Sequence, residues 1–172
     1  MHDPLSVAFK LAEERFDWGE HSARIGHSSQ LKVPANHPDW LFELKADGFR
    51  GLLYIDHGKG WLISRNARAM KRFGALAWAL VPVIDAETAI LDGEIVVKDP
   101  TGRPIFLDLV RRRGDASYIA FDLLWLDGRD LRGLPLNERK RALRRLLLPR
   151  SNLIEEALYV SGRGRDLFAV AR

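Results

Sequence analysis

The stretch Trp40-Leu41-Phe42-Glu43-Leu44-Lys45-Ala46-Asp47-Gly48-Phe49-Arg50 places a lysine between apolar residues and a tight Asp-Gly turn. An unperturbed lysine amine has a pKa of about 10.4, so it is protonated at neutral pH and is not nucleophilic. Burial against apolar neighbours, and nearby cations, lower that pKa. These residues leave two interpretations of Lys45 open: an activated nucleophile held against apolar neighbours, or a surface lysine at a strand end before an ordinary turn.

Outward from this stretch, the pattern predicts strands over 40–45, 49–56 and 61–64, joined by short turns as an antiparallel meander. Further strands are expected over 89–97, 117–126 and 158–160. Helices are expected over 74–80, 105–113, 137–148 and 166–171, with a turn at 99–102. Because strands and helices mix without strict alternation, we predict an α+β fold with antiparallel sheet.

The N-terminal segment, residues 1–38, is weakly patterned and is read as an extension of the patterned region 39–172. Residues 5–16 have the pattern of a short amphipathic helix, and residues 21–30 are polar and loop-like. Pro34 and Pro38 then indicate a loop before the patterned region.

The composition is that of one globular domain, with 172 residues, 47% of them hydrophobic and 29% charged. No cysteine is present, which excludes a disulfide scaffold and a thiolate metal site. The five histidines show no metal-ligand spacing. Neither a leader segment nor a long apolar run is visible, so the expected location is the cytoplasm, in association with the nucleoid.

Positive charge is concentrated toward the C-terminus. Residues 111–172 carry 14 Lys/Arg against 8 Asp/Glu, an excess of six, whereas residues 1–110 carry 13 against 15. Arginine supplies nearly all of the excess, and its planar guanidinium pairs phosphate oxygens bidentately. The sequence leaves two interpretations open, namely a nucleic-acid contact or a solvated helix face.

Four segments, in order, resemble the covalent nucleotidyltransferases, which include ATP-dependent DNA ligases, RNA ligases and mRNA-capping enzymes. Residues 45–50 match the K-x-D-G-x-R motif, and 64–66 resemble the segment after the first hairpin. Residues 91–96 resemble the D-G-E strand, and 118–124 the following aromatic strand. The sequence of residues 133–140 is most similar to that of bacterial DNA ligases related to the end-joining ligase D. The resemblance implies an adenylation domain of nucleotidyltransferase (ATP-grasp-like) fold.

The resemblance also implies roles for individual residues. Lys45 is the catalytic residue, which attacks the α-phosphate of ATP, expels pyrophosphate and holds AMP as a lysyl phosphoramidate. The remaining groups bind the nucleotide: Glu43 near the adenine edge, Arg50 and Arg65 at the ribose, Glu94 at a ribose hydroxyl or a metal, and Phe121 stacked on adenine. The alternative interpretations are a Glu94 carboxylate paired with an arginine at a strand end, and a Phe121 ring in the core.

Two motifs of the resembled family, E-G-x-V and K-x-K, are missing from the sequence, and so is an oligonucleotide-binding (OB-fold) domain. We therefore expect an adenylation domain that is incomplete at its C-terminus. The expected function is that of an ATP-dependent DNA ligase, which uses ATP and Mg²⁺ or another divalent cation on nicked or broken DNA. End-joining proteins or a missing C-terminal polypeptide are the expected partners. The alternative is a catalytically weak or silent nucleotide- or DNA-binding remnant, and an RNA-ligase or capping enzyme is a third option.

Overall fold

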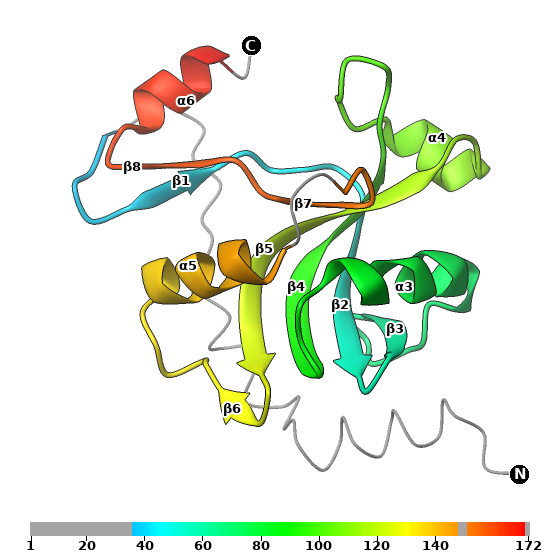
Figure 1. Ribbon diagram of the computed structural model, residues 1–172. Helices are drawn as coiled ribbons and strands as arrows, with labels where there is room; N and C mark the ends of the chain where they lie inside the picture. Colours follow the sequence, from blue (N-terminus) through cyan, green and yellow to red (C-terminus); the bar gives the residue numbers. More distant parts are fainter. Residues whose placement is uncertain (1–35, 148–150, 171–172) are drawn as a thin grey trace, which may run out of the picture.

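The main sheet of the computed structural model has the strand order β3-β2-β4-β5-β6, and every neighbouring pair is antiparallel (Figure 1). The structure describes residues 36–147 and 151–170, so the helix expected over 5–16 and the loop over 21–30 lie outside it. The strands of the sheet are β2 (Phe49–Asp56), β3 (Lys59–Ser64), β4 (Thr88–Val97), β5 (Ala116–Leu126), β6 (Arg129–Asp130) and a short parallel neighbour of β5, β7 (Ile154–Glu156).

Two helices cover one face of this sheet, and the main hydrophobic core lies between them and the strands. α3 (Gly74–Leu80) contributes Leu76 and Leu80, and α5 (Leu136–Leu146) contributes Leu143 and Leu146. The remaining helices are η1 (Lys71–Phe73), η2 (Val81–Val83), α4 (Phe106–Arg111) and α6 (Gly164–Val170). None of the helices in the described ranges has the length and apolar composition needed to cross a lipid bilayer.

The α+β fold is confirmed, and so are the central strands and the helices, although α4 is shorter than expected, α5 ends two residues earlier and α6 begins two residues earlier. The meander prediction is wrong in its first strand. β1 (Leu41–Glu43) pairs with β8 (Tyr159–Ser161) in a separate two-stranded sheet. Both edges of β2 are already taken by β3 and β4, so β1 has no free edge there. Strands β6 and β7, which are only two and three residues long, were not predicted.

Tyr118 of β5 connects the three central strands, β2, β4 and β5, from within the core. Its hydroxyl group donates a shared hydrogen bond to the carbonyl oxygens of Gly51 (2.8 Å) and Leu91 (3.1 Å). Complete burial raises the pKa of this hydroxyl well above its ordinary value, so it stays a donor. Gly93 makes the arrangement possible, because a Cβ atom there would lie 2.5 Å from the Tyr118 ring and from the Ile119 carbonyl oxygen.

The β4–β5 ladder contains two register shifts, and one of them isolates Phe121. Asp92 is opposite Asp122 and Gly93 is opposite Ala120, so Phe121 is the extra residue between them. A β-bulge of this kind bends the strand and redirects side chains next to it. The consequence is that Phe121 lies beside α5 with a main-chain carbonyl group that needs another partner.

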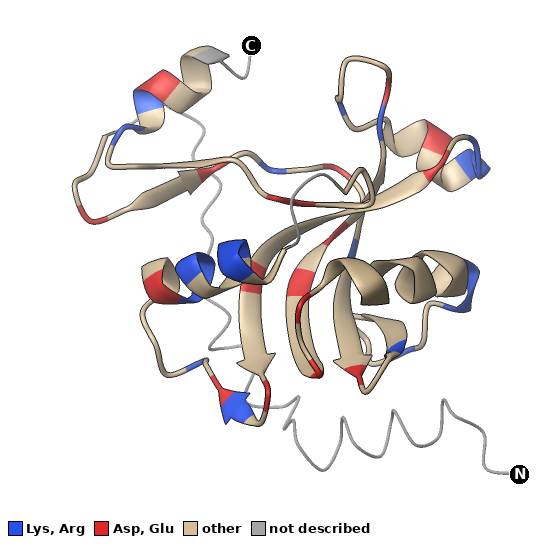
Figure 2. Cartoon of the chain, in the orientation of Figure 1, with Lys and Arg blue, Asp and Glu red and all other residues tan. Residues whose placement is uncertain are grey.

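Helix α5 carries five basic residues, which divide into an exposed group and a buried pair (Figure 2). Arg141, Arg144 and Arg145 are exposed, but Arg139 and Lys140 are buried. The Arg139 guanidinium binds the buried Asp122 carboxylate through two hydrogen bonds of 2.8 and 2.7 Å. Part of the C-terminal positive charge therefore neutralises carboxylates inside the domain and does not face solvent.

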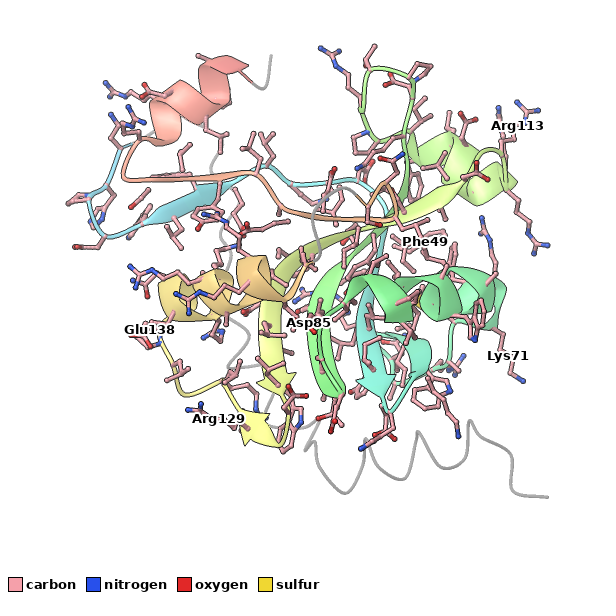
Figure 3. All side chains as sticks on the ribbon, viewed as in Figure 1. Phe49, Lys71, Asp85, Arg113, Arg129 and Glu138 are labelled. Carbon is pink, nitrogen blue, oxygen red and sulfur yellow. The ribbon has the colours of Figure 1, made fainter. Side chains whose placement is uncertain are left out.

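Helix α4 is attached to the region before α3 through aromatic rings. The Phe49 ring, labelled in Figure 3, lies 6.1 Å from the Phe73 ring and 5.7 Å from the Phe106 ring, both at steep angles. The Arg72 guanidinium lies over Phe49 and Phe73 and donates to the Leu109 carbonyl oxygen of α4. Phe49, the residue after the Asp-Gly turn, is thereby fixed on the helix-covered face.

The contact between Gly93 and Tyr118 makes a stability prediction with an internal control. Gly93→Ala should lower the free energy of unfolding by about 2–3 kcal/mol or more, because the new Cβ overlaps a ring and a backbone oxygen that are both fixed. Gly74→Ala should raise it by about 0.5–1 kcal/mol, because Gly74 is helical and nothing lies within 4 Å of its added Cβ. Urea denaturation of the three proteins measures both values, and equal effects of the two substitutions would contradict the packing described above.

Candidate functional site

The site lies on the sheet face opposite α3 and α5. Side chains alternate along a strand, so β2 directs Phe49 toward the helices and Arg50 to the other face. By the same alternation β4 presents Asp92 and Glu94 beside Arg50, and Arg50 is the direct cross-strand partner of Glu94. The motifs at 45–50 and 91–96 are therefore brought together by the pairing of β2 with β4.

Arg50 is engaged by a carboxylate of the protein. Its Nε and Nη2 atoms donate to the two oxygens of Asp92 at 3.1 and 2.6 Å, and Asp92 is completely buried. These hydrogen bonds raise the pKa of the Arg50 guanidinium above its usual range. The same guanidinium lies 5.3 Å from the centroid of the Phe121 ring, so Arg50 connects β2, β4 and β5 on this face.

Glu94 is a half-buried carboxyl group beside the Lys45 segment. Burial raises its pKa above the ordinary value of 4.5, and the positive charges of Lys45 and Arg50 and a hydrogen bond from the Gly48 backbone N–H oppose that rise. Gly48 can approach because it has no side chain, and a Cβ there would collide with the Ile95 carbonyl oxygen. The Asp-Gly turn thus places the Lys45 segment against the D-G-E strand.

Of the two interpretations of Lys45, the structure shows the surface lysine, which is not held against apolar neighbours. Its side chain is 69% exposed, and its Nζ atom lies 3.4 Å from the Ala46 carbonyl oxygen and 3.9 Å from Asp47. The reason is that β1 ends at Glu43, two residues before Lys45, and the chain then loops toward Gly48. The Lys45 amine is therefore open to solvent in this structure.

Glu43 is linked to the main sheet by a lysine that the sequence analysis did not single out. The buried Nζ atom of Lys140 binds the Glu43 carboxylate and donates to the Phe121 carbonyl oxygen at 2.8 Å. The signal was present in the sequence. Residues 136, 139, 140, 143 and 146 fall on one side of a helix, so Arg139 and Lys140 share the buried side with the leucines.

The Phe121 ring belongs to a small apolar cluster on the site face. Its members come from the two strands β4 and β5 and from two loops: Ala46, Val96, Ile119, Phe121 and Ala157. This is an apolar surface next to charged groups, the composition of many small-molecule sites. The stacking of Phe121 on a base stays a prediction.

Arg65 and a metal site are less well supported by the geometry. Arg65 is exposed in the turn that follows β3, and the structure gives it no contact with the other candidate residues in the described ranges. Those ranges contain no group of three or more potential His, Cys, Asp or Glu ligands. Because Asp92 forms an ion pair with Arg50, Glu94 is the carboxylate that remains available for a cation on this face.

The chain is similar to known DNA ligases over most of its length. The family model described as "ATP dependent DNA ligase domain" matches residues 24–164. The multifunctional non-homologous end joining DNA repair protein LigD of Mycobacterium tuberculosis is 38% identical over 135 residues, which are 77% of this chain and 18% of that protein. DNA ligase C of the same organism is 38% identical over 127 residues, 64% of this chain and 34% of that protein.

Solved structures give the same result. A mycobacterial DNA ligase D complexed with ATP and MES superposes with a TM-score of 0.67 at 33% identity, covering 80% of this chain and 46% of that one. The ligase domain of M. tuberculosis LigD gives 0.67 at 34% identity, covering 80% and 45%. The chain thus spans less than half the length of these relatives. The match to the family model and the agreement of fold show that the chain belongs to the family of ATP-dependent DNA ligase domains.

Proposed function

We propose that this chain forms the nucleotide-binding part of a DNA ligase adenylation domain, in which Lys45 receives AMP from ATP for the sealing of DNA breaks. The observation that carries the proposal is the pairing of β2 with β4, which sets Arg50 opposite Glu94 and packs Gly48 closely against Glu94 and Ile95. It brings the lysine loop, Arg50 and the D-G-E strand to one place on the sheet, beside the apolar cluster around Phe121.

In the proposed step the Lys45 Nζ atom bonds to the α-phosphorus of ATP while the bond from that phosphorus to the oxygen bridging the α- and β-phosphates breaks. Pyrophosphate leaves with the bonding electrons, and the amine nitrogen loses its proton to solvent or to a neighbouring base. The exposed amine can reach a bound phosphate because no side chain covers more than a minor part of it. Apolar contact with Phe121 and acceptance of a ribose hydroxyl by Glu94 are the proposed nucleotide contacts.

A divalent cation such as Mg²⁺ is part of the proposal. Mg²⁺ at phosphate sites is commonly held by one or two carboxylates together with phosphate oxygens, and Glu94 is the carboxylate proposed for this role, since Asp92 on the same face is bound by Arg50. The cation would neutralise charge on the phosphates. DNA is the proposed partner, supported by the exposed arginines of α5, Arg141, Arg144 and Arg145.

A second candidate function is a nucleotide- or DNA-binding unit with weak or no adenylation. Two observations favour it. The Lys45 side chain is mostly exposed, and the Arg50 guanidinium already binds the Asp92 carboxylate. In that case phosphoryl transfer would depend on groups supplied by additional polypeptide, since it requires charge on the phosphates to be neutralised.

Labelling with ATP that carries ³²P in the α-phosphate tests the two functions. With Mg²⁺ present, we expect a label that survives denaturing electrophoresis, is released by acid, and is lost in Lys45→Ala but kept in Lys59→Ala, a control on an exposed lysine of β3. The experiment uses both this chain and a longer protein that carries E-G-x-V and K-x-K motifs. Label on the longer protein alone supports the second function for this chain, and label on Lys45→Ala would exclude Lys45 as the nucleophile.

We expect the ionised Glu94 side chain to lower the stability of the fold while it supports adenylation. Its pKa is raised in the folded state, so this group favours folding at acid pH and costs stability as the pH rises through the folded pKa. Glu94→Gln removes that cost, and we expect its urea midpoint to exceed that of the wild type at pH 7.5, with the difference shrinking toward pH 4. Adenylation should fall at the same time.

The matched control for this substitution is Glu87→Gln, which changes an exposed carboxylate and should leave the urea midpoint unchanged at both pH values. A Glu94→Gln protein that is less stable than the wild type at pH 7.5 would show that the ion contacts of Glu94 outweigh its burial.

A further inference from the structure

Lys140 is a completely buried cation whose three neighbours come from three different strands. Its Nζ atom binds the Glu43 carboxylate of β1 and the Phe121 carbonyl oxygen of β5, and it lies 4.7 Å from the centroid of the Tyr159 ring of β8. An ammonium group has three donors, and burying its charge is costly unless the charge is paired. The cost is offset only while Glu43 and Phe121 stay where they are.

The β-bulge explains why a helix supplies this group. At the outer edge of β5, the Ala120 carbonyl accepts from Ala157 N–H at 2.8 Å and the Leu124 carbonyl accepts from Leu131 N–H at 2.9 Å. Between these two points the bulged residue Phe121 has no partner in the β4–β5 register. Lys140 binds its carbonyl oxygen there, so the side chain of α5 takes the place of a neighbouring strand.

Lys140 also constrains what Glu43 can do. The Glu43 side chain is 30% exposed and Lys140 uses its Oε1 atom, which leaves acceptor capacity on the carboxylate for a ligand. An ionised carboxylate accepts hydrogen bonds and cannot donate them. At the six-position of a purine, adenine carries an amino group that donates, whereas guanine carries a carbonyl oxygen that accepts. A carboxylate fixed opposite the six-position therefore favours adenine, whereas guanine would place two acceptors facing each other there.

Building on the proposed function, we propose that Lys140 is a positioning residue for base selection: it fixes the Glu43 carboxylate next to Phe121, and through Glu43 it makes the site prefer adenine over guanine nucleotides. Lys140 does not touch the base, because its donors are directed at Glu43, Phe121 and Tyr159. Lys140 instead sets the position of the Glu43 carboxylate, which contacts the edge of the base, relative to the Phe121 ring, which stacks on its face. These two contacts lie on strands that belong to different sheets.

The affinities of the whole chain for ATP and for GTP, measured by titration calorimetry, test this role. Lys140→Met should lower the ratio of ATP to GTP affinity on the order of tenfold, the effect of misplacing one charge-assisted hydrogen bond. Lys140→Arg keeps the charge and should retain most of the preference. Lys98→Met is the matched control, since Lys98 is a mostly buried lysine that pairs with Glu155 of β7 without reaching Glu43.

Glu43→Gln provides the same test without removing a buried group, so it covers the case in which Lys140→Met does not fold. Its amide can present a donor or an acceptor, and the ATP preference should fall on the order of tenfold. In the double variant with Lys140→Met the two losses should not add. Equal losses of ATP and GTP affinity in Lys140→Met, or an unchanged ratio in Glu43→Gln, would overturn the proposal and leave the proposed function standing.

A measurement without nucleotide separates the two proposals. The Leu44 amide donates to the Leu158 carbonyl oxygen at 3.1 Å, directly after Glu43, and reports the attachment of β1. Lys140→Met should speed hydrogen exchange at Leu44 by about tenfold or more and leave the Tyr118 amide of β5 protected. Unchanged exchange at Leu44 would refute the positioning role even if the wild-type chain bound neither nucleotide, an outcome that would by itself refute the proposed function.

Discussion

The close approach of Gly93 to Tyr118 is the constraint on which the rest of the domain depends. Tyr118 needs the space above Gly93 to place its hydroxyl group between the carbonyl oxygens of β2 and β4. That contact fixes the register of the three central strands. Register in turn decides that Asp92 and Glu94 face Arg50 on one side while the leucines of β4 and α5 pack on the other.

Charge inside this domain is arranged in pairs that cross between elements. Asp92 is neutralised by Arg50 of β2, Asp122 by Arg139 of α5, and Lys140 by Glu43 of β1. The Asp92–Arg50 pair adds to the backbone pairing of β2 with β4, whereas the other two pairs join α5 to strands with which it shares no backbone ladder. Because an uncompensated buried charge costs several kcal/mol, roughly 3–5 when one partner is removed, the two pairs of α5 favour one arrangement of this helix on the strands. The basic helix α5 is thus a structural element as well as a charged surface.

The fold was largely predictable because its signals are local. The strands 49–56, 89–97 and 117–126 alternate or are continuously apolar, and short turns separate two of the hairpin strands. Pairing of β1 with β8 could not be predicted, since it joins segments more than 110 residues apart and both strands are three residues long. Of the candidate site residues, Arg50, Glu94 and Phe121 come together, Glu43 joins them through Lys140, and Arg65 stays apart.

The sequence by itself determined the strand that carries Arg50, the D-G-E strand, and the order of the motifs, because side-chain periodicity and glycine turns act over a few residues. The exposure of Lys45, the engagement of Arg50 by Asp92 and the burial of Lys140 were decided only by tertiary structure. Whether a charged group is free or paired depends on which distant segment packs against it. In this chain Lys45, for which the sequence left burial and exposure both open, is exposed because β1 ends before it. Lys140, on the expected basic helix, is buried because the bulge at Phe121 requires a donor from α5.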